Sequence, residues 1–148
     1  MKVRFETTEC SRCGGSGHYS FTPMYGTTCF KCSGSGTEMT RTGSKAHAIY
    51  EAAMTIPASE VKTGMVLFTD VKLSGRRTRE TVETVGPSTT VSSTHADGTP
   101  VEYLELRFRD GKYGLHLFPH SPVRLAVTPD VYERVHLALD GLKGATIS

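Results

Sequence analysis

All four cysteines of this 148-residue chain fall within one short segment, in two pairs with the spacing C-x2-C-x15-C-x2-C. They are Cys10, Cys13, Cys29 and Cys32. A secreted disulfide scaffold spreads its cysteines along the chain, whereas two such pairs are typical of a four-thiolate zinc site. Zinc prefers four ligands in a tetrahedron, and a complete set of sulfurs leaves no position open for water or substrate. The pattern therefore predicts one structural zinc ion.

A glycine-rich segment follows each pair. Residues 10–17 read CSRCGGSG, and residues 29–36 read CFKCSGSG. Because glycine adopts positive φ at little cost, the backbone can curl around a metal and direct N–H groups at the thiolates. Four-sulfur sites also accept iron, and C-x2-C pairs also occur in dithiol oxidoreductases. Redox pairs usually stand at the start of a helix that follows a strand, so the glycine-rich turns favour the metal site.

Both segments follow the repeat C-x-x-C-x-G-x-G, which resembles the cysteine-rich zinc region of the DnaJ chaperone family. The resemblance covers residues 9–37. That family carries four repeats and two zinc ions, so two repeats imply a single ion. The two-repeat form also resembles small zinc proteins of bacteriophages and bacteria, which implies an accessory protein. The His-Pro-Asp tripeptide of a J-domain is absent, so the resemblance does not imply stimulation of an ATP-dependent chaperone.

Beyond the cysteines, the residue pattern changes from helical to strand periodicity. Residues 37–44 read as a linker, and Ser44 is the expected N-cap of a helix over 45–54. A second helix is expected to start after Thr128 as N-cap, with Pro129 at its first position and an apolar stripe that ends at Leu142. Strands are expected at 65–70, 78–85, 89–94, 101–109, 112–118 and 123–127, with Gly86-Pro87 stopping the second of them.

One hairpin is predicted in full register. Asp110-Gly111 suits a two-residue type I′ turn, because this dipeptide tolerates positive φ. Counting outward from the turn places four leucines on one face of the hairpin. The predicted pairs are Arg109 with Lys112, Phe108 with Tyr113, Arg107 with Gly114, Leu106 with Leu115, Glu105 with His116, and Leu104 with Leu117.

Together these elements predict a mainly β fold with short helices. Residues 1–40 form the zinc finger, residues 41–60 a linker and short helix, and residues 61–148 a small β domain with a C-terminal helix. Short antiparallel strands at this density favour a small barrel that resembles the Src-homology-3 fold, or a curled sheet. Such a likeness at the level of the fold carries no function with it.

Patterns that indicate catalysis are missing from the sequence. Neither a dinucleotide-binding glycine motif nor a Walker loop occurs. His116 and His120 flank Pro119, which disfavours the helical spacing of a second metal site. No apolar run approaches the roughly 20 residues of a spanning helix, and the N-terminus has no signal-peptide core. We therefore expect a soluble, non-enzymatic, cytoplasmic protein, in the host cytoplasm if a phage encodes it.

Two kinds of partner remain open. A protein partner is preferred, because the finger carries aromatic and methionine side chains of the kind that anchor interfaces. Nucleic acid is the alternative, with the basic loop 75–79 and the lysines and arginines near the cysteines as phosphate contacts. The formal net charge of +2 is low for that role. The candidate partner-binding residues are Tyr19, Phe21, Met24, Tyr25, Phe30, Arg76, Arg77 and Arg79; the candidate phosphate contacts near the cysteines are Lys2, Arg4, Arg12, Lys31, Arg41 and Lys45.

Overall fold

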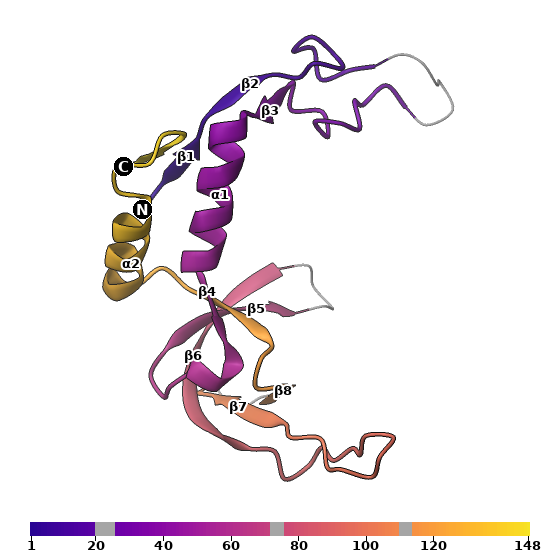
Figure 1. Cartoon of the computed structure of the whole chain (residues 1–148), viewed down its shortest axis with the longest axis vertical. Coiled ribbons are helices and arrows are strands. Elements are labelled where there is room, and N and C mark those ends of the chain that lie inside the picture. Colours follow the sequence, from indigo (N-terminus) through magenta and orange to yellow (C-terminus); the bar gives the residue numbers. More distant parts are fainter. Residues whose placement is uncertain (20–25, 72–75, 110–113) are drawn as a thin grey trace. The chain divides into compact units, whose positions relative to one another are not determined.

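The computed structural model describes residues 1–19, 26–71, 76–109 and 114–148 (Figure 1). It contains short antiparallel strands and two α-helices in this part of the chain, which confirms the predicted mainly β class. Two compact units are present. The first comprises residues 1–50 and 136–148, and the second comprises residues 51–135.

The first unit contains two small antiparallel ladders. Strand β1 (Val3–Phe5) pairs with β10 (Ala145–Ile147), and β2 (Thr7–Glu9) pairs with β3 (Thr37–Met39). The expected linker over 37–44 is therefore wrong, because its first residues form β3. The last strand of the chain completes the N-terminal unit, so the unit boundaries differ from the expected division at residues 40 and 60.

Helix α1 (Arg41–Ala53) begins earlier than the predicted residue 45. The Gly43 N–H donates to Thr40 Oγ1 at 3.0 Å, and the Ser44 N–H donates to the Thr40 carbonyl at 2.8 Å. Thr40 is thus the N-cap, and the assignment of Ser44 to that position is wrong. The Thr40 hydroxyl also lies 2.9 Å from Glu6 Oε2, a contact with a residue far away in sequence that tertiary folding supplies.

Gly43 lies where α1 approaches the backbone of residue 6. The glycine is buried, and a Cβ on it would overlap the Glu6 carbonyl oxygen. Gly43→Ala is therefore expected to destabilise the first unit by about 2 kcal/mol or more, although glycine-to-alanine changes inside helices usually stabilise by about 1 kcal/mol. Thermal unfolding followed by circular dichroism measures this. Ser44→Ala, an exposed position in the same helix, is the control, and a gain in stability for Gly43→Ala would contradict the packing.

The second unit is built on one six-stranded antiparallel sheet with the order β4-β9-β5-β6-β7-β8. Strands β4 and β8 stand at its two edges and do not pair with each other, so the described residues form an open antiparallel sheet, and the expected closed barrel of the Src-homology-3 type is not found among them. A 3-10 turn (Ala58–Glu60) follows β4. The strands are β4 (Thr55–Pro57), β5 (Val66–Val71), β6 (Arg76–Pro87), β7 (Leu104–Phe108), β8 (Gly114–Leu117) and β9 (Pro122–Leu125).

The pairing of β7 with β8 confirms the predicted hairpin register. Leu104 lies opposite Leu117 and Leu106 opposite Leu115, and the pairs Glu105–His116 and Arg107–Gly114 are also as expected. Leu106 and Phe108 are buried in the core. The Asp-Gly turn and the two pairs next to it involve residues 110–113, which lie outside the described residues.

The strand expected over 89–94 is not formed. Within 89–103 the only pairing is an isolated bridge between Thr94 and Pro100, since Ser88 turns the chain by accepting the Val91 N–H at 3.0 Å. Strand β6 also runs two residues past the predicted end at Val85, because Gly86 and Pro87 pair with β7 before the strand ends. Serine side chains that bond their own backbone compete with the ladder, which explains the missing strand.

Helix α2 (Pro129–Leu139) begins as predicted. The Val131 N–H lies 3.4 Å from Thr128 Oγ1, and the Tyr132 N–H donates to the Thr128 carbonyl at 2.8 Å. Val135 and Leu139 are buried on its apolar face, whereas Leu142, expected in the same stripe, lies past the helix and is exposed. Among the described residues, neither helix has the length and apolar character needed to cross a membrane.

Candidate metal centre

The four cysteine sulfurs converge on one point in the first unit. Every Sγ lies within 4.8 Å of the other three. Across the two pairs, Cys10 and Cys29 are 4.0 Å apart, and Cys13 and Cys32 are 3.8 Å apart. A tetrahedron with Zn–S bonds of about 2.3 Å has edges of about 3.8 Å. All four cysteines are free of disulfides, so the sulfurs fit a single metal ion as a complete ligand set.

The strands and glycine turns around the cysteines hold the pairs together. Strand β2 ends at residue 9, and β3 starts at residue 37, so their pairing brings both pairs to the end of one ladder. The first cysteine of each pair also donates a backbone hydrogen bond to the last glycine of the other cysteine segment. The Cys10 N–H donates to the Gly36 carbonyl at 2.8 Å, and the Cys29 N–H donates to the Gly17 carbonyl at 2.9 Å.

These two bonds are equivalent to each other, and several other contacts of the first cysteine segment recur 19 residues later. Ser16 Oγ lies 2.8 Å from the Cys13 carbonyl and 3.0 Å from the His18 carbonyl. Ser35 Oγ lies at the same two distances from the Cys32 and Thr37 carbonyls. Residues 10–18 and 29–37 therefore form two equivalent knuckles around an approximate two-fold axis.

The last glycine of each knuckle stands against the backbone of the other knuckle. Gly17 and Gly36 have φ of 73° and 75°. A Cβ on Gly17 would overlap the Gly34 carbonyl oxygen, and a Cβ on Gly36 would overlap the Gly15 carbonyl oxygen. Glycine is thus required here for two separate reasons, its backbone conformation and its lack of a side chain.

Backbone N–H groups point at the sulfurs. The Gly17 N–H donates to Cys13 Sγ at 3.3 Å. Burial raises the pKa of the Cys32 thiol, but hydrogen bonds from the Gly36 N–H, the Cys29 side chain and the Gly34 N–H outweigh it and lower that pKa to about 6. Burial raises the pKa of Cys13. Metal binding requires thiolates, so the donors on Cys32 favour the bound state.

Ser33 differs in residue type from the equivalent residue of the first knuckle, Gly14. Both have positive φ, 50° at Ser33 and 58° at Gly14, but only Ser33 carries a Cβ. A residue with a Cβ loses roughly 1–2 kcal/mol in this conformation, and the greater freedom of glycine in the unfolded chain offsets about half of that. Ser33→Gly is therefore expected to stabilise the metal-bound protein by about 0.5 kcal/mol. Chemical denaturation at fixed zinc concentration measures it, and destabilisation would argue against the positive φ.

The candidate partner residues have different surroundings. Phe30 is exposed, and Tyr19 is half-buried against the cysteine cluster. Arg79 donates to the Val127 carbonyl at 2.8 Å, so one of its donors serves the fold. Arg76 and Arg77 lie in β6, with side chains outside the description. Phe21, Met24 and Tyr25 lie outside the described residues.

Arg12 contributes a contact that the sequence did not indicate. Its guanidinium carbon lies 3.6 Å from the centre of the Phe30 ring and 4.5 Å from that of Tyr19. Lys31, the equivalent residue 19 positions later, lies 2.7 Å from Glu38 Oε2 instead. The 19-residue offset between the two repeats is the sequence signal that could have identified Arg12 and Lys31 as equivalent residues.

His116 links β8 to the loop after β6. Its Nδ1 lies 3.0 Å from Ser88 Oγ, and its Nε2 lies 3.5 Å from Thr90 Oγ1. Ser88 Oγ also accepts a backbone N–H, so this group serves the fold of the loop. Over the described ranges, the four cysteines are the one cluster of metal-ligating side chains.

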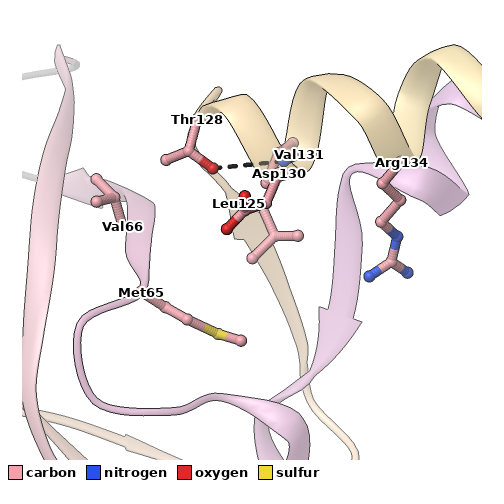
Figure 2. Close-up of a pocket in the computed structure, with 7 residues that line it drawn as sticks. All are labelled: Met65, Val66, Leu125, Thr128, Asp130, Val131 and Arg134. Atoms are coloured by element: carbon pink, nitrogen blue, oxygen red, sulfur yellow. Dashed lines mark hydrogen bonds between the residues drawn. The ribbon is translucent and has the colours of Figure 1, made fainter.

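A pocket of about 180 Å³ lies in the second unit at the start of α2 (Figure 2). Its walls include Met65, Val66 and Leu125, and the charged side chains of Asp130 and Arg134 line it as well. The described part of the chain leaves no buried side-chain nitrogen or oxygen without a hydrogen bond.

Comparison with known proteins adds no assignment. No family model matches the chain, and no curated protein or solved structure is detectably similar to it.

Proposed function

We propose that this chain is a non-catalytic binding module whose N-terminal unit is held by one structural zinc ion. The convergence of four sulfurs from two equivalent knuckles carries the proposal. The set supplies all the ligands of a tetrahedral ion, so a bound metal has a structural role. The C-x-x-C-x-G-x-G repeat supports an accessory protein of a phage or bacterium, acting in the cytoplasm.

The charge around the metal supports a protein partner over nucleic acid. Four thiolates outnumber the two charges of Zn²⁺, so the filled centre carries an excess of two negative charges. Arg12 and Lys31 lie at the knuckles and offset it, but the carboxylates of Glu9 and Glu38 lie there as well. A region with this balance attracts phosphate backbones poorly.

Metal and thiol content together test the structural zinc. The purified full chain is expected to contain one zinc by mass spectrometry, with thiols that a disulfide reagent reaches only after a chelator is added. A metal-free protein with a reversible dithiol would overturn the proposal and favour an oxidoreductase. Iron in place of zinc would show as visible absorbance.

A mobility-shift assay with single- and double-stranded DNA and RNA tests the kind of partner. No shift is expected at low salt. A shift that weakens steeply as salt rises would mark nucleic acid as the partner.

A further inference from the structure

The approximate two-fold symmetry of the knuckles breaks down at their two cations. Lys31 contacts Ser11 Oγ and pairs with Glu38. Arg12 occupies the equivalent position but lies over the rings of Phe30 and Tyr19. Ser11 and Phe30 are equivalent residues, and so are Tyr19 and Glu38. We define the Lys31 edge as Lys31, Ser11 and Glu38, and the Arg12 edge as Arg12, Phe30 and Tyr19.

The Arg12 edge combines a guanidinium that lacks a paired carboxylate in the described ranges with an exposed ring. Phe30 is 68% exposed, the largest fraction for any phenylalanine or tyrosine in the described ranges. In the same ranges, no carboxylate pairs with Arg12, whereas Glu38 neutralises Lys31. A stacked guanidinium uses its face against the ring and keeps its N–H donors at the rim. Those donors suit a carboxylate, which a guanidinium binds with two parallel hydrogen bonds.

The edge is also fixed in place before any partner arrives. The rings of Phe30 and Tyr19 restrict the Arg12 side chain, so less freedom is lost on binding. Tyr19 packs against the cysteine cluster, and Phe30 sits between two ligands, Cys29 and Cys32. The geometry of the edge therefore depends on the metal. Tyrosine and arginine are also among the residues that most often dominate binding energy at protein interfaces.

We propose that the Arg12 edge is the docking surface of this module, and that its occupant is a polypeptide segment with a carboxylate next to an aromatic or aliphatic side chain. The carboxylate binds the rim of the Arg12 guanidinium, and the apolar side chain covers the ring of Phe30. This inference rests on the proposed function, because it needs the metal-held knuckles. The negative balance of the filled metal centre favours a polypeptide with one carboxylate over a chain of phosphates.

A displayed library of random 12-residue peptides, panned on the zinc-loaded full chain, provides the probe. Enriched sequences are expected to place Asp or Glu beside an aromatic or aliphatic residue. The enriched peptides are then synthesised, and their Kd is measured by fluorescence anisotropy. Arg12→Ala and Phe30→Ser, which installs the residue type of the other knuckle, are each expected to raise Kd about 30-fold.

Two further variants are matched to Arg12→Ala. Lys31→Ala removes the equivalent cation and is expected to leave Kd within about twofold. Arg12→Lys keeps the charge but not the bidentate fork, and it is expected to lose most of the affinity. Zinc content is measured for every variant. Three outcomes overturn the docking surface alone, provided that the protein holds one zinc per chain. They are an unchanged Kd in Arg12→Ala, a panning experiment that enriches no peptides, and a loss of affinity in Lys31→Ala equal to that in Arg12→Ala. Absence of zinc in the unmutated chain overturns the proposed function.

A 20-residue oligothymidylate is the remaining probe. No binding is expected at low salt. Binding that Arg12→Ala abolishes would assign this edge to single-stranded nucleic acid and overturn the polypeptide.

Discussion

Cys32→Ser is expected to abolish metal binding and to unfold the two knuckles, while residues 51–135 keep their own thermal transition. A serine hydroxyl does not replace a thiolate on zinc, and three remaining sulfurs leave the ion exposed to water. Metal binding supplies on the order of 10 kcal/mol to small zinc-dependent folds. Zinc content by mass spectrometry should fall from one per chain to none.

Hydrogen exchange locates the damage from this substitution. The amides of Cys10 and Cys29 donate across the knuckles and are expected to lose protection, whereas the β5–β6 ladder keeps it. Ser11→Ala, at an exposed position between two ligands, is the control that keeps its zinc. Removing the metal with a chelator should reproduce the effect of Cys32→Ser. Full zinc occupancy in Cys32→Ser would show that the ligand set is assigned incorrectly.

Gly36→Ala is expected to destabilise the metal-bound protein by about 3–5 kcal/mol. The new methyl group would overlap the Gly15 carbonyl oxygen, and that oxygen belongs to the backbone of the other knuckle, which cannot turn away. A substitution that combines a backbone clash with positive φ belongs to the most damaging class. The measurement is the midpoint of chemical denaturation at saturating zinc, together with zinc retention against a competing chelator.

Gly14→Ala separates the two causes. Gly14 has a φ of 58°, but a Cβ there would meet no atom within 4 Å. Its alanine variant therefore loses only the conformational term, about 1 kcal/mol. Equal losses in Gly14→Ala and Gly36→Ala would mean that the knuckles do not approach each other as closely as the structure has them.

Features that depend on neighbouring residues were predictable from the sequence. The cysteine spacing predicted the cluster of four sulfurs that could hold a metal ion, and turn chemistry together with leucine alternation predicted the β7–β8 register. Thr128 and Pro129 fixed the start of α2 for the same reason, because a cap acts within one helical turn.

Features that depend on distant residues were not. The sequence pattern pointed to Ser44 as the cap of α1, but the cap is Thr40, whose hydroxyl also contacts Glu6, a residue far away in the sequence. Strands β1 and β10 have three residues each, too few to show an alternating pattern, so their pairing across the whole chain left no signal. The contact of Arg12 with Phe30 was hidden for a different reason. The two residues become neighbours only when the two cysteine segments pack against each other, and the helical and strand periodicities used to read the sequence do not reveal that packing.

The β1–β10 ladder determines the order in which parts of the first unit can fold during synthesis. The knuckles and the β2–β3 ladder need only residues 7–39, so the four cysteines can come together early in synthesis. Strand β1 must wait for residues 145–147, which are made after the entire sheet of the second unit. The segment before the four cysteines therefore stays without its partner strand until residues 145–147 have been made, so the first unit is begun before the second and completed after it.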